Sequence, residues 1–275
     1  MKTKNIALAV VLGLVMSSGT LSAAGKKIVM EGSTTVLPIA QIAAEEFMKM
    51  NPEADITVRG GGSGVGAASL IDKSCDIANM SRAMKDTEVQ KAVGRGVEPK
   101  AHVVAMDGIA VILNPSNPIK SFTRQQVKDI YTGKISNWSK LGGEDKKIVV
   151  VSRDSASGTY EAFGALALGG AKLRKDALMQ ASNQAVANTV GATPNGIGYV
   201  GLGYITDKVK AVPVAGVTIS KTTVLTAKYP YSRPLFMYTN GAPQGDVKDF
   251  FDFLLSADGQ KLVDEAGFVA LKEKK

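Results

Sequence analysis

One unit recurs three times along this chain and restricts its fold more than any other feature. It consists of an apolar strand, a loop of glycine and hydroxyl residues, and the start of a helix, and the three loops span residues 31–38, 59–66 and 152–159. The first N–H groups of a helix have no partners inside it and carry partial positive charge, so each loop can hold an anion. For one loop alone, an ordinary helix cap explains the same residues. The choice between an anion site and an ordinary helix cap therefore depends on the other loops of the chain.

The loop at 152–159 contains the strongest candidate for binding an anion. It follows the apolar run 148–151 and precedes a stretch that can be helical. The guanidinium group of Arg153 offers a planar fork of donors that suits a phosphate or a carboxylate. In the alternative interpretation, Ser157 or Thr159 caps the helix and Arg153 is solvated. A related loop at 79–82 follows another apolar segment and adds a second arginine, Arg82.

Apolar periodicity and turn residues predict the remaining elements. Pro38 fits the first turn of a helix, and Thr123 with Gln126 forms a capping box for a helix that Gly133 closes. Strands alternate with helices along the chain, which predicts α/β layers with mostly parallel sheets. Further expected elements are strands at 108–113, 197–200 and 235–238, and helices at 173–181, 186–190, 247–255 and 256–267.

The N-terminus has the features of a secretory signal peptide. Lys2 and Lys4 precede the apolar run 6–16, and Ser22-Ala23-Ala24 offers a cleavage site after either alanine. No later apolar run is long enough to span a bilayer. The 275 residues are 45% hydrophobic, enough for one large domain or two lobes. We expect an exported, soluble mature protein, in the periplasm because no lipid-anchor cysteine follows the small residues.

The charge balance suits small anions better than nucleic acid. The chain has 33 basic and 25 acidic residues, and removing Lys2 and Lys4 leaves 31 against 25, a net charge of +6. The basic residues are dispersed without an aromatic ladder, so we expect no nucleic acid partner. Cys75 is the single cysteine, which excludes an intrachain disulfide and predicts a small buried side chain.

Catalytic and cofactor motifs are absent. His102 is the single histidine, and no Gly-x-Ser-x-Gly elbow or Cys/His metal spacing occurs. Residues 196–201 match Gly-x-Gly-x-x-Gly but follow Pro194-Asn195 rather than a strand, so a dinucleotide site is not expected. We therefore predict no enzyme activity, no metal and no cofactor. Hydroxyl and glycine loops with two arginines look instead like a cage for a tetrahedral oxyanion.

In their order and spacing these motifs resemble the phosphate-binding proteins of bacterial Pst phosphate ABC transporters, in the compact branch of that family. The resemblance covers nearly the whole mature chain and rests on several short motifs. They are Gly32-Ser33-Thr34-Thr35-Val36, Gly61-Gly62-Ser63-Gly64, Asp76-Ile77-Ala78 with Ser81-Arg82, Asp107 to Val111, Tyr131 to Trp138, Ser152 to Thr159, Ile197 to Val200 and Phe253 to Gly267.

The resemblance implies an α/β fold of the type II periplasmic binding protein class, in which two lobes joined by two crossing strands enclose the ligand. It places the signal peptide at 1–24, lobe 1 at 25–106 plus 235–275, and lobe 2 at 107–234. It also implies crossings near 105–113 and 230–238. The phosphate-binding residues that it implies are Ser33, Thr34, Thr35, Ser63, Ser81, Arg82, Arg153, Ser157, Gly158 and Thr159, and we add Asp107 as a candidate.

One position departs from the family. Longer members carry an aspartate where this chain has Ser81, and that carboxylate accepts the proton of hydrogen phosphate. A fixed acceptor rejects sulfate, which has no such proton at neutral pH. Asp107 could take this role or could be a turn residue before Gly108; Asp76 and Asp154 are the alternatives.

We thus expect an exported, monomeric protein that binds inorganic phosphate without turnover and delivers it to an ABC permease in the inner membrane. One alternative keeps the fold and changes the ligand to sulfate, molybdate or tungstate. Another is an exported phosphoester hydrolase, which the missing metal ligands and the near-absence of histidine disfavour.

Overall fold

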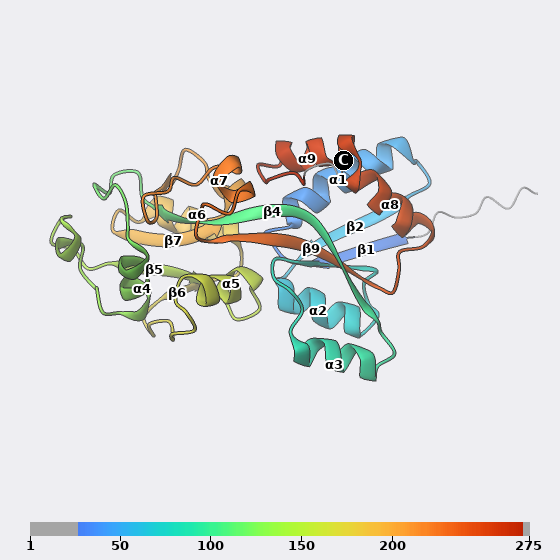
Figure 1. Ribbon diagram of the computed structural model, residues 1–275, viewed down its shortest axis with the longest axis horizontal. Coiled ribbons are helices and arrows are strands. Elements are labelled where there is room, and N and C mark those ends of the chain that lie inside the picture. Colours follow the sequence, from blue (N-terminus) through green and yellow to red (C-terminus); the bar gives the residue numbers. More distant parts are fainter. Residues whose placement is uncertain (1–26, 272–275) are drawn as a thin grey trace, which may run out of the picture.

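Two long strands pass through both halves of the molecule and set its shape (Figure 1). β4 (Pro99–Leu113) and β9 (Ser232–Asn240) pair antiparallel, from Pro99 opposite Asn240 to Gly108 opposite Ser232. They lie where the resemblance implies the two crossings, near 105–113 and 230–238, and both extend beyond the strands expected at 108–113 and 235–238. The computed structural model describes residues 27–271, so the predicted signal peptide, 1–24, lies outside the described residues.

The other elements alternate between strand and helix. The strands are β1 (Lys27–Gly32), β2 (Asp55–Gly60), β3 (Ile77–Met80), β5 (Val149–Arg153), β6 (Leu178–Gln180), β7 (Gly196–Gly201) and β8 (Lys210–Ala211). The helices are α1 (Leu37–Met50), α2 (Ser63–Ile71), α3 (Asp86–Gly94), α4 (Arg124–Thr132), α5 (Gly158–Leu166), α6 (Asn183–Ala192), α7 (Lys221–Leu225), α8 (Gly245–Leu255) and α9 (Ala257–Glu265). The 3₁₀ helices are η1 (Trp138–Leu141) and η2 (Leu202–Tyr204).

The strands follow the order β2-β1-β3-β9-β4-β7-β5-β6, with β8 also paired to β4. We name lobe 1 the half built on β1, β2 and β3, with α1, α2, α3, α8 and α9, and lobe 2 the half built on β5 to β8, with α4 to α7. The outer pairs in both lobes are parallel. The central pairs, β3–β9, β9–β4, β4–β7 and β4–β8, are antiparallel. The expectation of mostly parallel sheets was therefore wrong at the centre, because the two crossing strands run in opposite directions.

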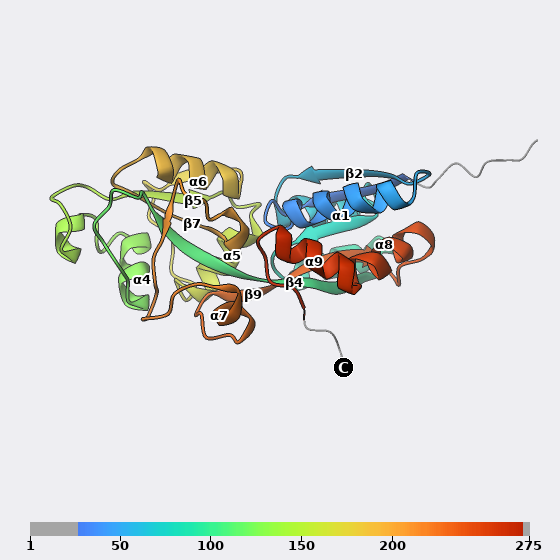
Figure 2. The same ribbon diagram turned by 90° about the horizontal axis from the view of Figure 1, so that it is seen from above.

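Each lobe buries apolar side chains on both faces of its sheet. In lobe 1, Ile28, Ile39 and Phe250 belong to a core beneath α1, α8 and α9, which lie on the same side in Figure 2. A second core beneath α2 and α3 includes Leu70 and the predicted buried Cys75. Within residues 27–271, no helix is both long and apolar enough to cross a membrane.

Capping residues correctly predicted where α4 begins and ends. One predicted helix, however, is replaced by a strand that pairs with a distant part of the chain. Thr123 and Gln126 form the expected capping box of α4, which ends at Gly133 in the left-handed region at φ 89°. The expected helix at 173–181 does not form. Residues 178–180 pair instead as β6 alongside β5, from Val151 opposite Leu178 to Arg153 opposite Gln180. Pairing with a neighbouring strand has outweighed the helical preference of this segment.

Candidate functional site

The starts of four helices meet between the two lobes. α1 and α2 come from lobe 1, and α5 and α6 come from lobe 2. The Oγ1 atoms of Thr35 and Thr159 lie 2.8 Å apart, which joins the start of α1 to that of α5. Asn183, the first residue of α6, donates to Thr34 Oγ1 at 3.1 Å and to Thr35 Oγ1 at 3.0 Å. Each helix start contributes partial positive charge, so their convergence favours an anion.

On the lobe 1 side, buried hydroxyl groups follow β1. Ser33, Thr34 and Thr35 are 2%, 7% and 0% exposed. Gly32 permits this tight turn because its φ of 136° lies outside the range of other residues, and an added Cβ would lie 2.3 Å from the Asn79 carbonyl oxygen. The Ser33 Oγ accepts the Thr35 N–H at 3.1 Å, which fixes the turn that presents both threonines.

The hydroxyl groups of Ser63 and Ser81 form the second part of the lobe 1 side. The Ser81 N–H donates to Ser63 Oγ at 3.0 Å, and the two Oγ atoms are 3.3 Å apart. Gly158 of lobe 2 packs directly on this pair, because a Cβ there would lie 2.2 Å from Ser63 Oγ and 2.8 Å from Ser81 Oγ. The lobes are therefore in close contact at these residues.

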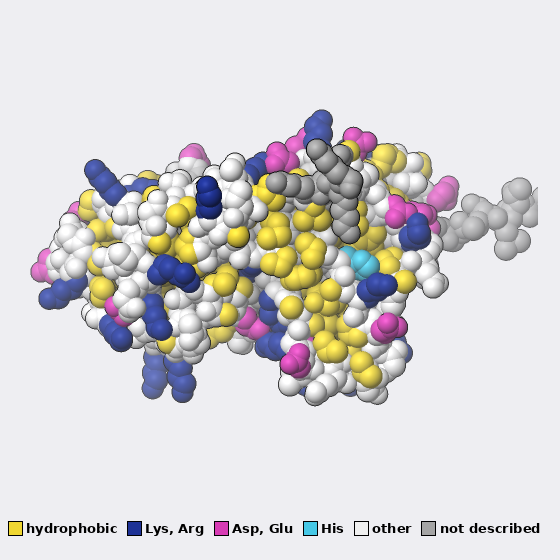
Figure 3. All heavy atoms as spheres, in the orientation of Figure 1, with side chains coloured by type: hydrophobic (Ala, Val, Ile, Leu, Met, Phe, Trp, Pro, Cys, Tyr) yellow, Lys and Arg dark blue, Asp and Glu magenta, His cyan; other side chains and the backbone are white. Residues whose placement is uncertain are grey.

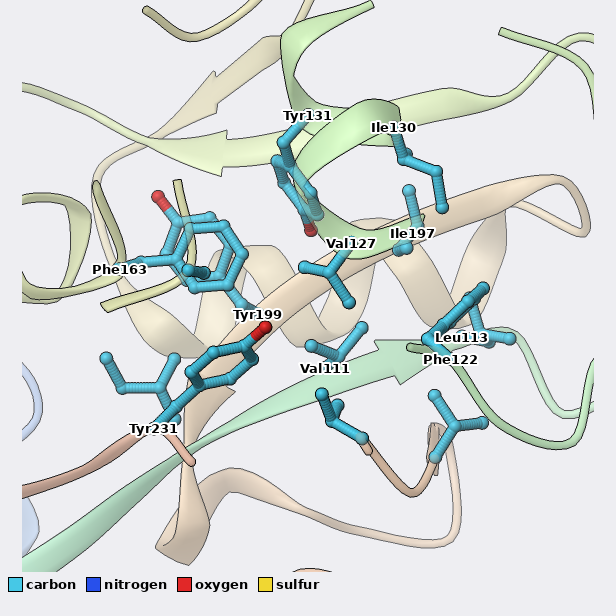
Figure 4. Close-up of a cluster of buried hydrophobic side chains, with 14 of the residues drawn as sticks. Val111, Leu113, Phe122, Val127, Ile130, Tyr131, Phe163, Ile197, Tyr199 and Tyr231 are labelled. Carbon is cyan, nitrogen blue, oxygen red and sulfur yellow. The ribbon is translucent and has the colours of Figure 1, made fainter. Parts of the chain in front are cut away.

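The lobe 2 side begins where β5 ends. Tyr199 supports that end: its hydroxyl lies 2.8 Å from Ser152 Oγ, and its ring stacks on Phe163 of α5 at 4.0 Å (Figure 4). Ser157 caps α5 by accepting the Tyr160 N–H at 3.2 Å. The N–H groups of Gly158 and Thr159 have no partner within the helix, so they remain free for an anion. The start of α5 thus combines a helix cap with donors that suit an anion.

Arg153 is fully buried, at 1% exposure, and braces the neighbouring helix start. Its Nε donates to the Gln180 carbonyl at 3.1 Å, and its Nη2 donates to the Ala181 carbonyl at 2.9 Å. These contacts hold the segment that leads into α6 and thereby place Asn183. Burial lowers the pKa of Arg153 below its ordinary value, while the charge of Asp154 opposes this shift. An arginine remains charged in proteins.

A buried ion pair between Asp107 of β4 and Arg233 of β9 completes the site. Arg233 donates to Asp107 Oδ2 from Nε at 3.0 Å and from Nη2 at 2.8 Å. Nη2 also reaches Thr159 Oγ1 at 3.0 Å, and Nη1 donates to the Ser81 carbonyl at 3.0 Å. Arg233 therefore contacts both lobes from a crossing strand.

Burial dominates the electrostatics of this pair. It raises the pKa of Asp107, and the nearby Arg233 charge and hydrogen bonds, including one from the Leu202 N–H, counteract the rise. It also lowers the pKa of Arg233, against the opposing effect of Asp107. With Arg153 the three groups carry one net positive charge. A site with this charge and many N–H and O–H donors suits an oxyanion.

Sequence reasoning missed Arg233 and Asn183. Neither belongs to a loop of glycine and hydroxyl residues. The available signals were weak: Arg233 is a single charge at the start of an apolar strand, and Asn183 follows Ser182, a helix cap.

Arg82 is engaged away from the hydroxyl groups. Its guanidinium binds Glu88 with two hydrogen bonds of 2.7 Å and lies 2.8 Å from a carboxylate oxygen of Glu161. The two alternatives to Asp107 as proton acceptor bind backbone groups instead: the Asp76 carboxylate accepts the Val29 N–H, and the Asp154 carboxylate accepts the Ala156 N–H. Among the three candidate acceptors, Asp107 is the one bonded to a residue that contacts the converging hydroxyl groups.

The arrangement offers donors rather than catalytic groups. His102 hydrogen-bonds with Thr239 at 3.0 Å and packs on Phe251, both in lobe 1. Within the described residues, no group of three or more His, Cys, Asp or Glu side chains could hold a metal ion. Residues 196–201, the Gly-x-Gly-x-x-Gly match, form the buried strand β7 itself.

Known proteins resemble the chain over most of its length. The model of the PBP superfamily domain matches residues 18–258. A curated relative, the phosphate-binding protein PstS of Bacillus subtilis (strain 168), is 36% identical over 92% of this chain and 83% of its own. PstS of Borreliella burgdorferi is 33% identical over 88% of both chains. The crystal structure of a phosphate ABC transporter substrate-binding protein from Clostridium perfringens, with bound phosphate, superposes with a TM-score of 0.84 at 35% identity. It covers 90% of this chain and all of its own.

Proposed function

Because this chain belongs to the PBP superfamily and, within it, to the phosphate-binding PstS proteins, we propose that it binds inorganic phosphate between its lobes and delivers it to an ABC transporter. The observation that supports this most directly is the convergence of the starts of α1, α5 and α6 on Thr35 and Thr159, beside the buried guanidinium of Arg233. A tetrahedral anion needs donors from several directions, and this arrangement supplies them.

In the proposed complex, phosphate oxygens take hydrogen bonds that these side chains otherwise give one another. Lobe 1 contributes hydroxyl groups from Ser33, Thr34, Thr35, Ser63 and Ser81. Lobe 2 contributes the start of α5 with Ser157, Gly158 and Thr159, and the charge of Arg153. We add Arg233 and Asn183 to this set because both contact Thr35 or Thr159. Arg82 is excluded from the direct contacts, since Glu88 and Glu161 occupy its guanidinium.

Asp107 is the proposed acceptor for the proton of the ligand. It is fully buried and fixed by Arg233 and the Leu202 N–H, so its carboxylate cannot turn away from an unsuitable anion. Sulfate would place an unprotonated oxygen against this carboxylate, and the repulsion would weaken its binding.

The same proposal covers the cellular context. The protein is exported through residues 1–24, works outside the cytoplasmic membrane as a monomer, and binds without turnover because its site lacks a nucleophile paired with a base. Lobe 1 comprises 25–106 plus 235–275 and lobe 2 comprises 107–234, so that the boundary crosses β4 and β9 at the Asp107–Arg233 pair.

Titration calorimetry of the mature protein with phosphate, arsenate, sulfate and molybdate tests the ligand. We expect one phosphate per chain, similar binding of arsenate, and affinity for sulfate at least about 100-fold lower, since a mismatched buried polar group costs several kcal/mol. Binding of another oxyanion without phosphate binding would overturn the assignment. Release of phosphate from a chromogenic phosphomonoester would instead favour a hydrolase.

A further inference from the structure

A network of charged residues joins the two lobes beside the anion site. Glu161 of α5 forms ion pairs with Arg82, whose Nε lies 2.8 Å from one carboxylate oxygen, and with Lys85, whose Nζ lies 2.9 Å from the other; both residues are in the segment between β3 and α3. Arg82 is itself held by Glu88 of α3 at 2.7 Å. Glu161 thus belongs to lobe 2 and its partners belong to lobe 1. Figure 3 shows acidic and basic side chains side by side in the notch between the lobes.

Most of the charged side chains in this network are partly shielded from water, which strengthens the attraction between them. The side chains of Arg82, Glu88 and Glu161 are 9%, 17% and 21% exposed, whereas that of Lys85 is 50% exposed. Burial alone would raise the pKa of Glu88, but the hydrogen bonds and charge of Arg82 and Lys85 outweigh it and lower that pKa. Partly buried charges interact through a lower effective dielectric constant than exposed ones, and salt screens them less.

Its position couples the network to ligand binding. Glu161 is in the first turn of α5, three residues after Gly158, which packs on Ser63 and Ser81. A backbone hydrogen bond also joins the two lobes here: the Gly64 N–H of lobe 1 donates to the Ala156 carbonyl of lobe 2 at 2.9 Å. Pairing of Glu161 with lobe 1 therefore keeps the start of α5 against the hydroxyl groups of that lobe.

We infer that Glu161, Arg82 and Lys85 act as an interlobe latch: they stabilise the closed arrangement of the lobes and raise phosphate affinity without contacting the anion. Arg82 is then a positioning residue. This inference rests on the proposed function, because it explains how the same site retains its ligand. When a binding-competent state is partly populated, the apparent dissociation constant rises as that population falls. Loss of the latch should therefore weaken phosphate binding mainly through faster dissociation.

Variants Glu161→Gln, Arg82→Gln and the double variant test the latch by calorimetry and stopped-flow dissociation. We expect Glu161→Gln to raise the phosphate Kd about tenfold. The double variant should bind phosphate no more weakly than Glu161→Gln, because the loss of Glu161 already breaks its pair with Arg82 and the two effects do not add. A matched control is Glu46→Gln on α1, which removes an equal charge from a pair with Lys49 inside lobe 1 and should leave the Kd unchanged.

A second measurement needs no phosphate. Small-angle scattering of the ligand-free protein should give a larger radius of gyration for Glu161→Gln than for Glu46→Gln and wild type. An unchanged Kd and radius for Glu161→Gln would overturn the latch. A further loss of affinity on adding Arg82→Gln to Glu161→Gln would show instead that Arg82 contacts the anion. Failure of the wild type to bind phosphate would refute the proposed function, whereas the scattering result would still report on the latch.

Discussion

At the residue scale, the site depends on a charged pair that the fold buries completely. Asp107 and Arg233 lie opposite each other in the register of β4 and β9. Removing one member of such a pair leaves an uncompensated buried charge and costs about 3–5 kcal/mol. The pair also aims Arg233 Nη2 at Thr159 Oγ1, so Asp107 orients the Arg233 cation toward the converging hydroxyl groups.

Replacing Asp107 with Asn should therefore affect both selectivity and stability. We expect phosphate affinity to fall at least about tenfold, because a neutral amide oxygen accepts the ligand proton more weakly than a carboxylate and the amide adds an NH2 donor beside Arg233. Sulfate affinity should fall less or should rise. The ratio of phosphate affinity to sulfate affinity should therefore decrease. Calorimetry with both anions measures this, and urea unfolding should show a loss of about 3 kcal/mol.

Asp154→Asn is the matched control for that experiment. Asp154 also lies near the start of α5, but its carboxylate accepts the Ala156 N–H, a role that the Asn side-chain oxygen can keep. Its phosphate-to-sulfate ratio should match that of the wild type. If the ratio of phosphate to sulfate affinity falls in Asp154→Asn and not in Asp107→Asn, Asp154 is the residue that accepts the proton of the ligand.

The hydroxyl residues could be predicted because each belongs to a local loop whose residues are adjacent in the sequence. Thr35, Ser63 and Thr159 all follow strands that apolar runs reveal. Arg233 could not be predicted in the same way. Its place at the site depends on the register between β4 and β9, whose paired residues are 126 positions apart at Asp107 and Arg233.

At the element scale, the start of α5 must approach lobe 1 closely, and Gly158 permits this approach. A Cβ at this position would overlap Ser63 Oγ at 2.2 Å. The backbone of Gly158 is not in the left-handed region, so an alanine would be tolerated by the helix itself. The requirement for glycine therefore comes from contact between lobes.

Gly158→Ala should separate binding from folding. We expect phosphate affinity to fall about 100-fold, since the added methyl group keeps the lobes apart, while thermal stability without ligand stays close to that of the wild type. Gly164→Ala is a control in the same helix, where an added Cβ meets nothing within 4 Å. It should bind normally and gain up to about 1 kcal/mol of stability. Equal affinities of the two variants would contradict the close approach.

Helices could be predicted from the sequence where the residues that define their ends lie within or next to the helix. The capping box of α4 is local and was expected, and the helix expected at 256–267 forms as α9 after the cap Ser256. α3 was not expected, because Ala92 is its single fully buried residue and its apolar pattern is weak. The segment 173–181 looked helical, yet its C-terminal part is held by β5 and by Arg153, which lie outside it in the sequence.

At the scale of the whole molecule, the two lobes share β4 and β9. Val104 and Leu235 contribute to the core of lobe 1, whereas Ile109 and Tyr231 contribute to a core of lobe 2. Unfolding either lobe thus exposes apolar residues of strands that the other lobe needs. The lobes should lose their structure together.

We expect one transition in differential scanning calorimetry, with equal calorimetric and van't Hoff enthalpies. Phosphate at 1,000 times its Kd should stabilise the protein by about 4 kcal/mol, or a rise in Tm of about 10 °C. Sulfate at the same concentration serves as the control and should give a much smaller rise. Two resolved transitions, one of them insensitive to phosphate, would show that the lobes unfold independently.

The place of β9 in the sheet also determines when lobe 1 can be completed. β9 lies between β3 and β4, although those strands end by residue 113 and β9 begins at residue 232. A ribosome adds residues in order, at about 5–20 per second. The segments of lobe 1 made first must therefore wait for all of lobe 2 before their sheet gains its central strand. The N-terminal half of the binding site is among the first parts synthesised and among the last to reach its folded place.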